Sequence, residues 1–77
     1  MKIQVRFFGQ LEELTGKVKI ETGHISDTDT LVKQILELYP SLKEFRFLVT
    51  VDRKVVGGNQ PLNPESEVAF LPPFSGG

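Results

Sequence analysis

One stretch near the middle of the chain decides the fold: residues 28–40 read TDTLVKQILELYP. Apolar residues recur in it every three or four positions, which is the period of a helix with one buried face. They form two adjacent lines, Leu31, Ile35 and Leu38 in one and Val32, Leu36 and Tyr39 in the other. Thr28 is the expected N-cap, and the helix should end near Leu38, before Pro40. So broad an apolar stripe needs a second layer to cover it.

The segments on both sides of this helix are expected to be strands, because their polar and apolar residues alternate. They are residues 2–8, 17–21, 47–51, 54–56 and 67–71, with one helical turn expected over 10–14. One long helix among such strands predicts a two-layer α+β domain, in which a sheet of four or five strands packs on the helix. The helix should cover the sheet face that carries Ile3, Val5, Val49, Val68 and Phe70.

Length and composition limit what the protein can be. The chain has 77 residues, so a single domain is expected over 1–77. Its net charge is −1, and without a basic excess nucleic acid is a poor candidate partner. It has no cysteine, which excludes a disulfide framework or thiolate metal site in this chain and fits the reducing cytoplasm. The opening residues alternate and the last apolar run, 68–71, is short, so neither a secretory leader nor a membrane span is expected.

The usual catalytic and metal-binding patterns are missing from the sequence. His24 is the only histidine, so neither a zinc site nor a serine–histidine pair is predicted. The acidic pairs Glu12-Glu13 and Asp27/Asp29 are better explained as a solvated turn and a helix start than as an acid–base dyad. The Gly-Gly at 57–58 lacks the lysine of a phosphate-binding loop. We therefore expect no bound metal or cofactor.

The last residues form a distinctive tail. After the final strand come Pro72-Pro73, which cannot continue a sheet ladder, and then a flexible tail over 72–77 that ends in Gly76-Gly77. Glycine has no Cβ, so such a tail can enter a channel too narrow for other residues. Its carboxylate could be activated as an acyl-adenylate by an enzyme that takes the tail into its active site. The alternative is a frayed terminus without function.

Two apolar residues fall on the polar face of their strands. Counting by twos places Phe8 and Leu71 on the side away from the helix, on strands that should be neighbours. With Phe74 just beyond, they could form an exposed partner-binding patch at the root of the tail. The alternative is that a loop covers them, or that they are ordinary scattered apolar side chains.

These residues resemble a known family. The ending VAFLPPFSGG, residues 68–77, is similar to that of the small subunit of molybdopterin synthase, the MoaD family of ubiquitin-like sulfur carriers. The opening VRFFG at 5–9 and LEELTG at 11–16 resemble the family's first strand and turn. Pro61-Leu62 and Glu67 also fit, so the resemblance covers the whole chain, most specifically at its two ends. It implies a ubiquitin-like β-grasp fold.

The resemblance also implies a mechanism and partners. An E1-like enzyme would use ATP and Mg²⁺ to adenylate the Gly77 carboxylate, and a sulfur donor protein would convert it to a thiocarboxylate. The sulfur would pass to a pterin precursor in the large subunit of molybdopterin synthase, within a cytoplasmic heterotetramer whose active site lies on that large subunit. Gly76 and Ser75 would be recognised in the tail. The implied partner interface consists of Phe8, Leu71, Pro72, Pro73 and Phe74.

Three alternatives remain at this point. The chain could be a sulfur carrier of another pathway such as thiamine biosynthesis, although those carriers usually lack the Phe-x-Pro-Pro run seen at 70–73. It could be a ubiquitin-like protein modifier joined to lysines through Gly77, which needs the same adenylation. It could also be an interaction domain whose terminus has no role.

Overall fold

The computed structural model describes residues 3–73. Within them the order of elements is strand, helix, strand, helix, short 3₁₀ helix and three further strands. The elements are β1 (Ile3–Phe7), α1 (Gln10–Thr15), β2 (Lys19–Thr22), α2 (Thr28–Leu38), η1 (Pro40–Glu44), β3 (Leu48–Val51), β4 (Lys54–Val55) and β5 (Glu67–Leu71).

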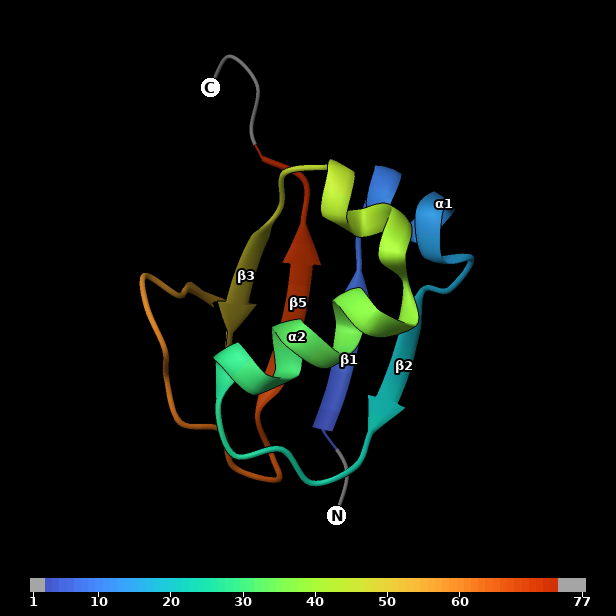
Figure 1. Ribbon diagram of the computed structural model, residues 1–77. Helices are drawn as coiled ribbons and strands as arrows, with labels where there is room; N and C mark the ends of the chain where they lie inside the picture. Colours follow the sequence, from blue (N-terminus) through green and yellow to red (C-terminus); the bar gives the residue numbers. More distant parts are fainter. Residues whose placement is uncertain (1–2, 74–77) are drawn as a thin grey trace.

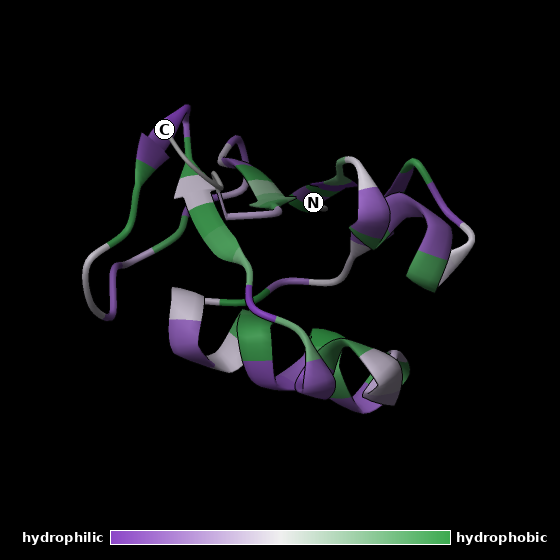
Figure 2. Cartoon of the chain, turned by 90° about the horizontal axis from the view of Figure 1, so that it is seen from above, coloured by the Kyte–Doolittle hydropathy of each residue, from purple (hydrophilic) through white to green (hydrophobic). Residues whose placement is uncertain are grey.

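The five strands form one mixed sheet in the order β2-β1-β5-β3-β4. The first and last strands, β1 and β5, lie side by side and parallel at its centre, and the other pairs are antiparallel. Helix α2 crosses one face of this sheet, so that helix and sheet make two layers (Figures 1 and 2). The predicted α+β architecture is confirmed. We call the face under α2 the inner face and the opposite one the outer face.

The start of α2 differs from the prediction by one residue. Asp27 is the N-cap: its carboxylate accepts a hydrogen bond from the Thr30 amide at 3.3 Å and another from the Thr30 hydroxyl at 2.8 Å. Thr28 is already inside the helix and buried. Its hydroxyl accepts a 2.9 Å hydrogen bond from the Gln60 amide, while Asn59 accepts one from the Asp29 amide. Thr28, which was expected to be the cap, instead links the start of the helix by a hydrogen bond to the loop that contains Gln60.

The apolar stripe of α2 is largely as expected. Leu31 and Ile35 are completely buried, but the prediction for Leu38 is wrong, since that side chain is 62% exposed. The chain turns at Tyr39 into η1, which lies against both α2 and α1. From there Leu42 enters the core and is completely buried. Its burial was not predicted, because a 3₁₀ turn has no helical or strand periodicity to reveal it.

The inner face of the sheet forms the core with α2. Every second residue of β1 and β5 is buried there, namely Ile3, Val5, Phe7, Val68 and Phe70, while Val49 of β3 is half-buried. The rings of Phe7 and Phe70 are 5.6 Å apart, and Phe47 lies 5.0 Å from Phe70. The inner face is therefore a continuous apolar surface, as predicted.

Candidate functional site

The outer face is organised in rows that run across the strands. Residues paired in the sheet register lie side by side, and successive rows on one face are separated by two residues, or about 7 Å. The row nearest the end of β5 contains Phe8, Leu71 and Leu48, and we call it the apolar row. The next contains Lys19, Arg6, Ala69, Thr50 and Val55. The third contains Glu21, Gln4 and Glu67.

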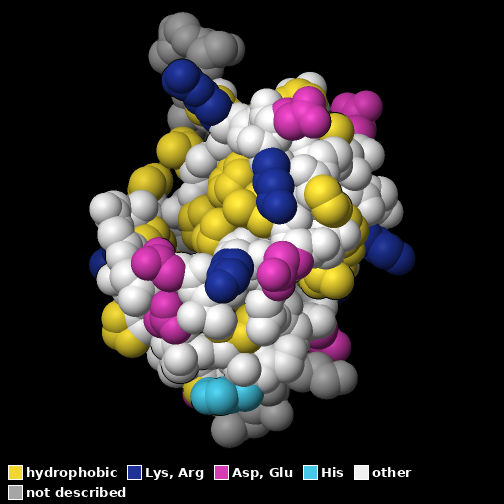
Figure 3. All heavy atoms as spheres, in the orientation of Figure 1, with side chains coloured by type: hydrophobic (Ala, Val, Ile, Leu, Met, Phe, Trp, Pro, Cys, Tyr) yellow, Lys and Arg dark blue, Asp and Glu magenta, His cyan; other side chains and the backbone are white. Residues whose placement is uncertain are grey.

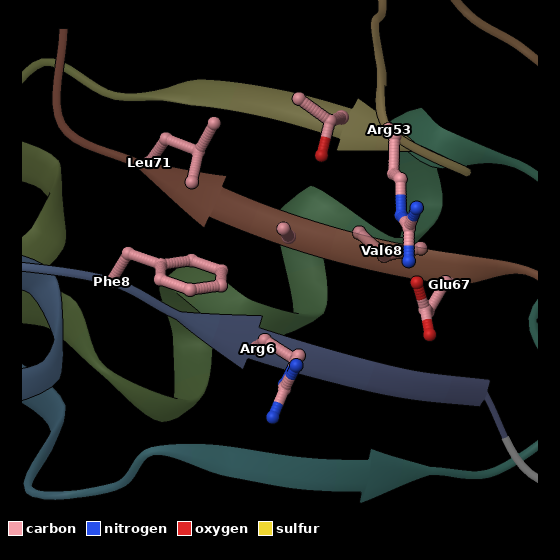
Figure 4. Close-up of a pocket in the computed structure, with 8 residues that line it drawn as sticks. Arg6, Phe8, Arg53, Glu67, Val68 and Leu71 are labelled. Carbon is pink, nitrogen blue, oxygen red and sulfur yellow. The ribbon is translucent and has the colours of Figure 1, made fainter.

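The apolar row contains the two residues that the sequence singled out. Phe8 lies just beyond β1, and its amide continues the ladder by donating a 3.1 Å hydrogen bond to the Phe70 carbonyl. Phe8 is 42% exposed, and Leu71 beside it is half-buried. Figure 4 shows both side chains on the outer face, close to one another. The structure thus brings the predicted pair together; their role in partner binding stays a prediction.

A recess of about 300 Å³ opens next to the apolar row. Ala69 lies in the middle of it, since the register places Arg6 on one side of this residue and Thr50 on the other. Phe8 and Leu71 line the end nearest the tail. We call this space the Ala69 recess.

Two arginines line the Ala69 recess from different elements. Arg6 stands on β1, with its guanidinium carbon 6.0 Å from the centroid of the Phe8 ring. Arg53 comes from the β3–β4 turn, and in Figure 4 its side chain extends across β5 toward Glu67. Neither residue was predicted to belong to a site. Alternation did place Arg6 on the polar face, but a turn residue such as Arg53 has no periodicity to show where its side chain goes.

The β3–β4 turn has an unusual backbone. Asp52 and Arg53 have φ angles of +50° and +71°, the pattern of a type I′ hairpin turn, which favours glycine at its second position. The turn is fastened to the start of β5: the Asp52 amide donates to the Glu67 carbonyl at 2.8 Å, and the Asp52 carboxylate accepts from the Glu67 amide at 3.0 Å. These bonds hold Arg53 in a conformation that L-residues other than asparagine and aspartate rarely adopt.

The root of the tail lies beside the apolar row. Pro72 is half-buried and Pro73 is exposed. Gly9, with φ +57° and ψ −132°, approaches the Pro72 ring so closely that a Cβ at residue 9 would be 3.1 Å from its Cγ. The remaining predicted tail residues, Phe74, Ser75, Gly76 and Gly77, lie outside the described residues.

The other candidate groups do not form a site. Within residues 3–73, no three acidic or histidine side chains come together in a metal-binding arrangement. Asp27 is explained by its capping role, and the hydrogen bond from the Thr30 hydroxyl holds the pKa of this carboxyl below its usual range. In the same part of the chain no helix has the length and apolar character needed to cross a bilayer.

A second recess of similar size opens on the other side of the sheet. It lies between the start of α2 and the β3–β4 hairpin, and Figure 3 shows hydrophobic atoms exposed in a hollow on this face. Val32, Phe47 and Val56 line it, with Asp29 as its charged group. It lies on the helix side of the sheet, and of the apolar row only Leu48 also lines it.

Comparison with known proteins decides the family. A model described as the ThiS family matches residues 5–77. The chain belongs to the ThiS family. Curated relatives extend the match: the molybdopterin synthase sulfur carrier subunits of Caenorhabditis elegans and Escherichia coli (strain K12) are 34% and 31% identical to it. The alignments cover 100% and 97% of this chain and 99% of each relative. The resemblance found from the tail and the first strand is therefore confirmed.

Solved structures agree with this ThiS-family assignment at the level of the fold. A putative molybdopterin converting factor subunit 1 from Pyrococcus furiosus superimposes with a TM-score of 0.87 at 19% identity, over 96% of this chain and 99% of that one. SAMP1 from Haloferax volcanii gives 0.80 at 18% identity, with both chains fully covered. The complex of subunits 1 and 2 of molybdopterin-converting factor from Helicobacter pylori gives 0.73 at 24%, again with full coverage of both chains. The predicted ubiquitin-like β-grasp is confirmed.

Proposed function

We propose that this protein is the sulfur carrier, or small, subunit of molybdopterin synthase. The observation that carries the proposal is the end-to-end similarity, at 31–34% identity, to proteins named as that subunit. The geometry supports it, because the apolar row lies at the root of the tail that would be handed to a partner.

The first proposed step makes the Gly77 carboxylate reactive. A carboxylate oxygen attacks the α-phosphorus of ATP in an E1-like enzyme that uses Mg²⁺, which forms the acyl-adenylate and releases pyrophosphate. A sulfur donor at the sulfide oxidation level then displaces AMP and leaves a thiocarboxylate. Since ATP is the activating substrate, the proposed place of action is the cytoplasm.

The second proposed step passes the sulfur on. The thiocarboxylate is a soft, ionised nucleophile that attacks a carbon of the pterin precursor in the large subunit, where the new carbon–sulfur bond replaces a carbon–oxygen bond and the oxygen substituent leaves with the electron pair. Hydrolysis of the acyl–sulfur bond then leaves the sulfur on the pterin and returns Gly77 as a carboxylate. Two rounds give the dithiolene that holds the metal. This chain supplies the reacting group, while the catalytic pocket belongs to the partner.

The outer face has the properties that this transfer requires. Covering Phe8 and Leu71 would remove exposed apolar surface from water, which favours association. The close approach of Pro72 to Gly9 gives the tail a defined starting point beside that contact. Proposed contacts of the same interface are Pro73 and Phe74, with Ser75 and Gly76 recognised in the channel that receives the tail. Positioning the sulfur in this way turns a bimolecular encounter into an oriented attack.

The test is the intact mass of the chain after incubation with ATP, the E1-like enzyme and a sulfur donor. The proposal expects one terminal oxygen to be replaced by sulfur, and transfer to the pterin precursor when the large subunit is added. A chain lacking Gly77 serves as the control and should fold but remain unmodified. An unchanged mass, with the enzyme active on another carrier, would overturn the proposal, and an isopeptide product would point to a protein modifier.

A further inference from the structure

The Ala69 recess is a place for a partner side chain. The methyl group of Ala69 leaves room between the larger residues that surround it, Arg6 on β1 and Thr50 on β3. The recess lies one row, or about 7 Å, from the apolar row on the same face. A partner that covers Phe8 and Leu71 therefore also brings a neighbouring side chain over Ala69.

The charge of this recess is locally positive in a chain that is weakly negative overall. Arg6 and Arg53 line it, against the single carboxylate of Glu67. The chain as a whole has a net charge of −1, so a basic composition does not explain the pair of arginines. In Figure 4 Glu67 lies at the end of the recess away from Phe8 and Leu71. Arg6 thus lies next to the apolar part of the face, and Arg53 lies nearer the Glu67 end of the recess.

The backbone at Arg53 supports a role for its side chain. Its φ of +71° is a conformation in which glycine is under no strain, whereas an L-residue with a long side chain is strained. The hydrogen bonds between Asp52 and the first residue of β5 keep the turn in this geometry. Strain of this kind is a reason to look for function, because a residue better suited to the turn is available.

We propose that the Ala69 recess receives an acidic side chain of the partner protein, held between Arg6 and Arg53. The inference rests on the proposed function, in which that partner is the large subunit of the synthase. Apolar contact at Phe8 and Leu71 supplies burial, and the carboxylate in the adjacent row sets the rotation of the partner about that contact. Charge pairs act in this way on orientation and association rate. The root of the tail at Pro72, on the same face, then takes one orientation relative to the partner.

The first experiment measures the dissociation constant of the full chain and the purified large subunit by titration calorimetry at two salt concentrations. R6Q and R53Q should each weaken binding by about tenfold or more, since each removes one charged partner of a carboxylate. Both should also flatten the dependence on salt. K19Q is the matched control: Lys19 is opposite Arg6 in the same row but does not line the recess. It should change binding less than twofold or so.

Two further variants distinguish an acidic occupant from an apolar one and from a defect of folding. R53G should raise the denaturation midpoint, because glycine relieves the backbone strain, and yet weaken the complex. A69L should weaken binding by filling the recess. A mere fold defect would lower both stability and binding, so opposite changes in R53G identify a role for the side chain itself.

The results can contradict the inference without contradicting the proposed function. If the unaltered chain binds the large subunit and both R6Q and R53Q bind equally well, the acidic occupant is wrong. If A69L is the only variant that weakens binding, the recess receives an apolar side chain, and the inference of an acidic occupant is again wrong. If the unaltered chain does not bind the large subunit, the proposed function is wrong and this inference falls with it.

Discussion

The two faces of the sheet are built by the same strands and have different compositions. On the inner face, alternate residues of β1 and β5 are all apolar and completely buried under α2. On the outer face, the residues between them form an apolar, a basic and an acidic row. The inner face needs only volume and hydrophobicity, which many residues supply. On the outer face the apolar, basic and acidic rows follow one another in a fixed sequence. A partner with a complementary sequence of groups can bind this face in one orientation.

The largest effect should come from the inner face. Phe70→Ala removes a completely buried ring that packs against Phe7 and Phe47, and it should destabilise the fold by about 3–5 kcal/mol. That is a large part of the stability of so small a domain. Its neighbour on the outer face, Leu71→Ala, is the control and should cost much less. Urea unfolding of the two variants checks the difference; equal losses would mean that the two faces are not distinct.

The apolar row should control binding more than stability. Leu71→Glu places a charge where the partner would cover it, and it should weaken the complex with the large subunit by about 2–3 kcal/mol. Its unfolding midpoint should change little, because the side chain is already partly in water. Val55→Glu is the control: Val55 is 63% exposed on the same face but belongs to the next row, at the sheet edge. A Leu71→Glu variant that binds normally would remove this row from the interface.

Gly9 lies where the outer face meets the tail, and changing it should have an intermediate effect. Gly9→Ala adds a Cβ 3.1 Å from the Pro72 ring at a φ of +57°, which should cost about 1–2 kcal/mol of stability. The shifted tail root should also slow sulfur transfer. Gly23→Ala is the matched control, since a Cβ there would meet nothing within 4 Å among the described atoms. Thermal unfolding and single-turnover transfer rates measure both effects.

The smallest effect concerns the N-cap of α2. The pKa of Asp27 is lowered by its hydrogen bonds, above all the one from the Thr30 hydroxyl, so the folded state favours the charged form. Asp27 therefore stabilises the folded state at pH values above its pKa in the unfolded chain, near 3.8. This contribution to the free energy of unfolding is lost as the pH falls through the lower pKa of the folded state. Asp27→Asn keeps a capping side chain and should flatten the acid end of the stability curve. Unfolding midpoints between pH 2 and 6 or so test this; an unchanged slope would contradict it.

Local sequence patterns were enough to predict most of the helices and strands. Alternation located β1 and β5, and the helical stripe located α2, because both patterns depend only on which face of an element is buried. The same alternation predicted that Phe8 and Leu71 lie on the sheet face that points away from the core. The errors occurred at the ends of the helix and just beyond it. Helical periodicity put Leu38 on the buried face, but it is exposed; Leu42 is buried from a 3₁₀ turn that no periodicity reveals; and the N-cap is Asp27 and not Thr28.

The sequence by itself determined the two-layer architecture, the tail and the apolar pair, because periodicity and residue type act within a few positions of the chain. The tertiary structure alone decided that Arg6 and Arg53 line one recess around Ala69. These residues are far apart in the chain, and they meet only because β1 and β3 both pair with β5 and a strained turn directs Arg53 back across the sheet. Contacts of this kind depend on strand order and turn geometry, which no local pattern records.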